Sequence, residues 1–140
     1  MRMLAGFLLI VAFGWADLAQ ACVPWRPKVY FQQGDVRALD EQVHILDDAA
    51  ATMQRISESR LVLVSHTESQ METGPSRELA ARRAEQISTA LVERGVAPER
   101  ISVRAEGADG MRDTLDVALS NYVWLVFTDL DGKPLTCSGT

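Results

Sequence analysis

A histidine and a glutamate two positions apart, His66 and Glu68, are the first residues whose types and spacing could do chemistry. The same His-x-Glu pattern carries a zinc ligand and the general acid–base of zinc deaminases, but those enzymes complete the metal site with Pro-Cys-x-x-Cys, which this sequence lacks. The sequence also contains no Gly-x-Ser-x-Gly nucleophile elbow and no phosphate-binding loop. We therefore expect a protein that is not an enzyme and uses no cofactor.

Arg83 lacks the local acidic partner that most helical arginines have. Arg82 has Glu78 four positions before it, whereas the positions three and four residues from Arg83 hold apolar residues and a glutamine. Arg83 therefore borders the buried face of its predicted helix. Its counter-charge must come from elsewhere, either from a ligand or from a loop carboxylate such as Glu72.

The first 21 residues predict a cleaved export signal. Arg2 gives a positive start, residues 4–16 form an apolar run too short to span a bilayer comfortably, and residues 19–21 (Ala-Gln-Ala) match a signal-peptidase site. An uncleaved membrane anchor is the alternative, but Asp17 interrupts the apolar stretch. We expect a mature chain that begins at Cys22, has no transmembrane span and lies in the periplasm or at the outer membrane.

The two cysteines, Cys22 and Cys137, lie near opposite ends of the chain. In an exported protein this even number predicts one disulfide that closes the domain. Lipidation of Cys22 is the competing interpretation, because bacterial lipoproteins carry their lipid on the first mature cysteine. A zinc site is not expected, since the two histidines, His44 and His66, show no paired ligand spacing.

Composition and charge restrict the class of protein. The 140 residues are 47% hydrophobic and 24% charged, which predicts one globular domain able to bury a core. Nineteen acidic and 14 basic residues give a formal net charge of −5, and no cluster of Lys and Arg is available to bind phosphates. We therefore do not expect nucleic acid as a partner.

Hydrophobic periodicity predicts the elements that position these residues. Strands are expected at 29–31, 61–64, 101–105 and 123–127, with 61–64 central in the sheet. Helices are expected over 39–56, with Val43 in the buried stripe, and from Ser76 to the break at Gly95. A further short helix is expected from Asp113. The β-α-β-α-β-β order predicts an α/β (α+β) two-layer sandwich, with two helices packed on one face of a mixed four-stranded sheet.

Several short motifs, in the right order, resemble the OmpA-like peptidoglycan-binding domain family of porins, the peptidoglycan-associated lipoprotein and MotB-like stator proteins. Residues 29–31 resemble its opening strand, residues 65–68 (Ser-His-Thr-Glu) its Gly-His-Thr-Asp, and residues 79–84 (Leu-Ala-Ala-Arg-Arg-Ala) its Leu-Ser-x-x-Arg-Ala. Glu68 and Arg83 lie 15 residues apart, as the family's acidic and basic pair do. The resemblance covers about residues 29–128.

The resemblance implies noncovalent binding of the diaminopimelate-containing stem peptide of peptidoglycan. Diaminopimelate presents an ammonium and a carboxylate close together, and the family's pattern assigns Glu68 to the ammonium and Arg83 to the carboxylate. Thr67 and Ser76 are lesser ligand-binding candidates. The helix N-terminus at Ser76 offers backbone N–H groups and a partial positive charge to the same carboxylate.

Some positions depart from the family's pattern. Glu68 replaces an Asp, and the family's Asn-Arg-Arg-Val falls near residues 120–123, where both arginines are missing. The alternative function is therefore a degenerate OmpA-like domain that has lost wall binding and serves as a structural or protein-partner-binding module.

The expected organisation is an export signal (1–21), a leader (22–28), the OmpA-like domain (29–128) and a C-terminal tail (129–140) that carries Cys137. The expected partners are peptidoglycan and envelope proteins of a Gram-negative cell.

Overall fold

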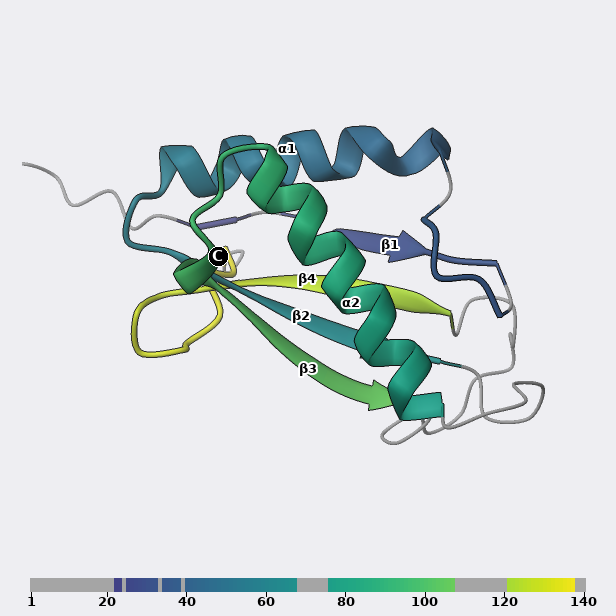
Figure 1. Cartoon of the computed structure of the whole chain (residues 1–140). Helices are drawn as coiled ribbons and strands as arrows, with labels where there is room; N and C mark the ends of the chain where they lie inside the picture. Colours follow the sequence, from purple (N-terminus) through teal and green to yellow (C-terminus); the bar gives the residue numbers. More distant parts are fainter. Residues whose placement is uncertain are drawn as a thin grey trace, which may run out of the picture.

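Four strands and two helices make up the fold in the computed structural model (Figure 1), which describes residues 22–23, 25–32, 34–38, 40–67, 76–107 and 121–137. The strands are β1 (Lys28–Tyr30), β2 (Arg60–His66), β3 (Ile101–Gly107) and β4 (Tyr122–Thr128). The helices are α1 (Val43–Arg55) and α2 (Ser76–Glu93), and the short 3-10 turns η1 (Asp40–Gln42) and η2 (Pro98–Arg100) precede α1 and β3. The predicted export signal and the short helix expected from Asp113 lie outside the described residues.

The strands form one mixed sheet in the order β1-β4-β2-β3. Strands β2 and β3 are parallel and are connected through α2, whereas β4 runs antiparallel to both of its neighbours, β1 and β2. Both helices lie on the same side of the sheet (Figure 1). The predicted two-layer sandwich is thus confirmed, and so is the central position of the strand that contains residues 61–64.

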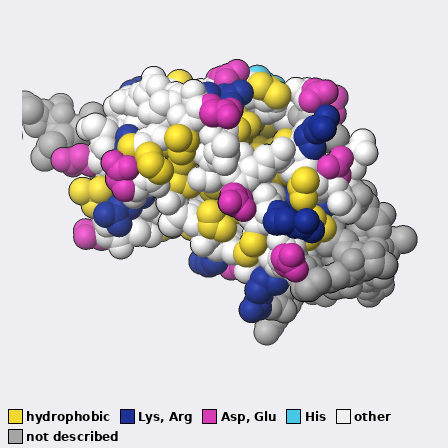
Figure 2. Space-filling view, viewed as in Figure 1, with side chains coloured by type: hydrophobic (Ala, Val, Ile, Leu, Met, Phe, Trp, Pro, Cys, Tyr) yellow, Lys and Arg dark blue, Asp and Glu magenta, His cyan; other side chains and the backbone are white. Residues whose placement is uncertain are grey.

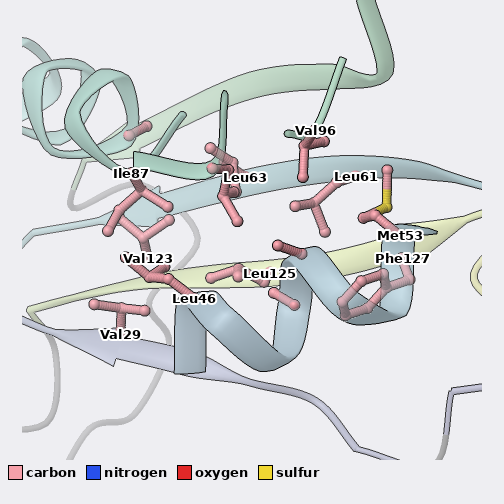
Figure 3. Packing of buried hydrophobic residues seen from close by; sticks show 14 of the residues in the cluster. Val29, Leu46, Met53, Leu61, Leu63, Ile87, Val96, Val123, Leu125 and Phe127 are labelled. Carbon is pink, nitrogen blue, oxygen red and sulfur yellow. The ribbon is translucent and has the colours of Figure 1, made fainter. Parts of the chain in front are cut away.

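The core lies between the helices and the sheet, where side chains from both layers meet (Figure 3). Alternate residues of β2 and β4 point towards the helices, so Leu61, Leu63 and Leu125 are almost fully buried. The helices contribute buried residues at helical spacing: Leu46, Ala49, Ala50 and Met53 from α1, and Ala80, Ala84, Ile87 and Leu91 from α2. Each large apolar side chain buried in this way contributes about 1.5–3 kcal/mol.

The prediction that Val43 belongs to the buried stripe is wrong, because this side chain is 44% exposed. Val43 is the first residue of α1, and the buried stripe begins one turn later, at Leu46. The small side chain of Ala49, which is fully buried, allows the helix to approach the core closely at that level.

Two features end the helices. Gly95 follows α2 with φ of 89°, a left-handed conformation that glycine adopts without strain, and its N–H donates to the carbonyl of Val92. After α1, the guanidinium of Arg100 donates to the carbonyl oxygens of Met53, Ile56 and Ser59 and to the Ser59 hydroxyl. Arg100 thereby satisfies acceptors that the end of a helix leaves without an internal partner.

Cys22 and Cys137 form a disulfide, with a sequence separation of 115, which confirms the predicted bridge. The two terminal segments also pair through their backbones, since the N–H of Val23 donates to Leu135 and the N–H of Leu135 donates to Phe127. Both segments are thereby fixed beside the end of β4. Within the described part of the chain, neither helix is long and apolar enough to cross a membrane.

The surface over the helices carries charges of both signs. Acidic and basic side chains are interspersed on the face shown in Figure 2, with hydrophobic side chains between them. His44 is exposed on α1.

Candidate functional site

The predicted site residues that the structure describes gather at one end of the sheet. Strand β2 ends at His66, and the register pairs His66 with Tyr122, the first residue of β4, which in turn pairs with Tyr30 at the end of β1. Thr67, directly after β2, and Asn121, directly before β4, therefore lie at this same end. Glu68, the predicted acidic partner, lies outside the described residues.

Arg83 projects from α2 into the interior, where its side chain is fully buried. Its Nε donates to the carbonyl oxygen of Asp35 at 2.7 Å, its Nη2 to the carbonyl oxygen of Gln32 at 3.1 Å, and its Nη1 to Oδ1 of Asn121 at 2.9 Å. The guanidinium also lies over the ring of Phe31, with 5.1 Å between its carbon and the ring centroid. Each nitrogen of the guanidinium thus has an acceptor within the protein.

The acceptors of Arg83 belong to two segments that are themselves joined. The N–H of Phe31 donates to the carbonyl of Asn121 at 2.9 Å, and Gln32 accepts a further bond from the N–H of Asp35 at 3.1 Å. Asn121 is 3% exposed and Arg83 is fully buried, so the bond between these two side chains is buried, whereas Gln32 and Asp35 are exposed. We call Arg83, Asn121, Phe31, Gln32 and Asp35 together the arginine network.

The sequence indicates that Arg83 lacks an acidic partner on its own helix, but it does not indicate which residues Arg83 contacts. Gln32 and Asp35 act through their backbone carbonyls, which every residue type has, so their side chains give no signal. Asn121 could have been found, because it lies where the related family has the Asn of Asn-Arg-Arg-Val.

The other predicted ligand-binding residues that the structure describes, Thr67 and Ser76, lie where β2 ends and where α2 begins. Thr67 is fully buried at the end of β2. Helix α2 begins at Ser76, as predicted, so its N-terminal turn directs backbone N–H groups out of the helix from this position. The structure does not describe the Ser76 side chain.

A second group of ionisable side chains surrounds His66. An irregularity in the pairing of β2 with β3 lies between Ser65 and His66, and Nε2 of His66 is 3.5 Å from a carboxylate oxygen of Glu106. The carboxylate of Glu106 also pairs with the guanidinium of Arg104. The centroids of the Tyr122 and His66 rings are 5.0 Å apart. Burial lowers the pKa of His66 below its ordinary value of 6.5, and the positive charge of Arg104 acts in the same direction, whereas Glu106 opposes them.

No group of three or more His, Cys, Asp or Glu side chains among the described residues is arranged to hold a metal ion. A cavity of about 650 Å³ opens beside the disulfide, where Cys22, Ile56, Glu58 and Leu130 line it. This cavity lies at the opposite end of the sheet from Arg83, so it is not the predicted site.

The sequence profile of the OmpA family matches residues 30–118. The fold is similar to that of the peptidoglycan-associated lipoprotein from Burkholderia pseudomallei, with 19% identity and a TM-score of 0.61 over 72% of this chain and 89% of that chain. It is also similar to the OmpA-like domain of FopA1 from Francisella tularensis, with 13% identity and a TM-score of 0.64 over 90% of both chains. The C-terminal domain of Helicobacter pylori MotB is similar at 20% identity, with a TM-score of 0.61 over 76% of this chain and 88% of that chain. At such identities the similarity shows a shared fold, and a search of curated proteins finds no significant match.

Proposed function

The chain belongs to the OmpA family, and from this premise we propose that it binds peptidoglycan noncovalently, through the diaminopimelate-containing stem peptide. Domains of this family are binding modules rather than enzymes. The observation that carries the proposal is the convergence of Thr67, the start of α2 and the arginine network at one end of the sheet. Of these parts, the resemblance to the family assigns Thr67, Ser76 at the start of α2 and Arg83 to the ligand.

The proposed recognition uses charge at both ends of one amino acid. Glu68 pairs with the ammonium of diaminopimelate, and Arg83 supplies the positive charge that attracts its carboxylate. The N–H groups at the start of α2 and the Thr67 hydroxyl complete the hydrogen bonds to the same carboxylate. The Arg83 guanidinium donates to neutral oxygen atoms of Asp35, Gln32 and Asn121.

We further propose that the protein is exported and works in the periplasm. The Cys22–Cys137 disulfide supports this location, because such bonds form and persist in oxidising compartments. The disulfide also occupies the sulfur that a lipid thioether at Cys22 needs, which favours a protein without a lipid anchor. Intact mass spectrometry of the exported protein tests both points: we expect a chain that begins at Cys22, carries no lipid and weighs two hydrogens less than the reduced form.

Cosedimentation with diaminopimelate-type sacculi tests wall binding. We expect the oxidised protein to bind, and the variants Glu68→Gln and Arg83→Ala to lose at least about tenfold in affinity, since each removes one charge-assisted contact worth about 1.5–3 kcal/mol. Arg82→Ala is the matched control, because Arg82 is the exposed neighbour on the same helix. Circular dichroism must show that each variant is folded. Equal binding by all variants would contradict the assigned roles.

The alternative function is a domain that keeps the fold but binds a protein partner instead of the wall. The burial of Arg83 favours this alternative, because a fully buried guanidinium that donates to backbone carbonyls is also the arrangement of a purely structural residue. Failure of the native, oxidised protein to cosediment with sacculi would support the alternative.

A further inference from the structure

We propose that the side of the sheet turned away from the helices binds an anionic lipid surface, with cationic side chains on the lipid headgroups and an apolar stripe between them. Both helices lie on the other side of the sheet (Figure 1). We call this surface the basic face and define it by Arg26, Lys28, Arg60, Tyr122, Trp124 and Val126. The inference goes beyond the proposed recognition of the stem peptide, because none of these residues has a role in it.

Tyr122, Trp124 and Val126 form the apolar stripe along β4. Alternate residues of a strand point to opposite sides of the sheet, and the intervening Val123 and Leu125 belong to the core on the helix side. The three residues of the stripe are partly exposed. Apolar patches with a polar rim mark interaction surfaces, and Tyr and Trp side chains gather where a membrane meets water.

Three cationic side chains surround this stripe. Lys28 pairs with Trp124 in the register of β1 and β4, and its ammonium lies 4.6 Å from the centroid of the Tyr122 ring. Arg26 and Arg60 are exposed. Among the described residues, none of these three cations has a carboxylate within ion-pair distance. They form no run in the sequence, and the sheet brings their charges to one side.

The positions of the charges favour an extended anionic surface over a single acidic peptide. Lys28 on β1 and Arg60 on β2 lie on either side of β4, which places the two strands about 10 Å apart. On the helix side, Asp40, Glu41 and Asp48 are exposed on η1 and α1. An anionic surface would therefore attract the basic face and repel α1, so the protein should dock in one orientation.

A hollow of about 150 Å³ adjoins the basic face. Arg26, Trp124 and Val126 line it together with Pro134 and Leu135 of the C-terminal segment, and most of its described lining is apolar. A cavity of about this size can hold an apolar group as large as benzene. An apolar hollow beside a guanidinium fits an amphiphile, whose anionic head contacts Arg26 while part of its chain enters the hollow. This combination favours a lipid over a soluble anion.

Flotation of the exported, oxidised protein with lipid vesicles tests the inference. One set of vesicles contains phosphatidylglycerol and phosphatidylcholine in equal parts, and the other contains phosphatidylcholine alone. We expect binding to the anionic set only. Raising the salt from about 50 mM to about 500 mM should release the protein, because the higher concentration screens the charges.

The double variant Arg26→Gln with Lys28→Gln should bind the anionic vesicles at least about tenfold more weakly, since each cation near such a surface contributes about fivefold. The matched control is Arg55→Gln with Arg82→Gln, which removes the same charge from exposed positions on the helices and should stay within about twofold of the native protein. Circular dichroism must show that the variants are folded. Should the first pair not fold, Arg26→Gln with Arg60→Gln decides the question.

Three results would overturn the inference: no binding of the native protein to anionic vesicles at low salt, equal binding to both sets of vesicles, or equal losses in the two double variants. Binding to soluble polyglutamate without binding to anionic vesicles would assign the basic face to an acidic protein instead. Failure to bind sacculi would contradict the proposed function but leave this inference standing, because no step of it uses Glu68 or Arg83.

Discussion

Removal of the disulfide by the double change Cys22→Ser and Cys137→Ser should lower the free energy of unfolding strongly. The cystine closes a loop with a sequence separation of 115, and the chain-entropy model gives about 4.8 kcal/mol for a loop of that length. For a domain of this size, a loss of that magnitude corresponds to a decrease in melting temperature of roughly 20 °C.

Part of this loss in the free energy of unfolding should appear as local opening of the two terminal segments. The terminal segments are held to each other and to β4 by the backbone bonds of Val23 and Leu135. Without the covalent bond these segments can detach while the sheet stays folded. We therefore expect hydrogen exchange to accelerate first in residues 22–27 and 134–137, and only later in β2.

Urea unfolding followed by circular dichroism, with and without a phosphine reductant, measures the effect. The reductant should destabilise the native protein to the level of the double serine variant and leave that variant unchanged. If the serine variant is within about 1 kcal/mol of the oxidised native protein, the reasoning from loop entropy is refuted for this chain.

Three further changes test the fold and its electrostatics. Arg100→Ala should lower the free energy of unfolding by about 2–4 kcal/mol, because it leaves the carbonyl oxygens after α1 without their donors. Urea unfolding measures this loss, and Arg100→Lys should recover only part of it. Leu63→Ala should cost about 2–5 kcal/mol by the same assay, against less than about 1 kcal/mol for Val103→Ala, because Leu63 is fully buried and Val103 is 48% exposed. The pKa of His66 is lowered in the folded state, so folding favours the neutral imidazole. Titration of His66 should therefore leave the free energy of unfolding unchanged above pH 6.5 and decrease it as the pH falls below 6.5. NMR titration should give a midpoint below 6.5 for His66, and a midpoint above 6.5 would contradict this assignment.

The elements of the fold could be predicted well from the sequence because burial follows simple periods. The apolar run at residues 61–64 indicated a central strand, and the spacing of Ala80, Ala84, Ile87 and Leu91 indicated the buried face of α2. Val43 was misplaced because periodicity defines a stripe but not where along a helix the core begins.

The site could be predicted only in part. The absence of an acidic neighbour predicted that the counter-charge of Arg83 comes from a ligand or from a loop carboxylate such as Glu72, which lies outside the described residues. The contacts that the structure describes are instead neutral oxygen atoms of Gln32, Asp35 and Asn121. The identity of these contacts could not be predicted, since they are mainly backbone carbonyls brought close by the pairing of β1 with β4. The roles of Glu68, Arg83, Thr67 and Ser76 in ligand binding stay predictions.

The disulfide and the candidate site lie at opposite ends of the sheet, and this has a mechanical consequence. Cys22 and Cys137 are joined beyond Thr128, the last residue of β4, whereas Asn121 precedes its first residue. A pull between a ligand held at the site and a protein partner bound at the disulfide end would therefore act along the strands. Under such a load the hydrogen bonds between neighbouring strands, which run across the direction of force, are sheared together instead of opening one after another. The covalent bond passes the tension to both terminal segments at once, so the domain would behave as a short, stiff link in series with whatever it holds.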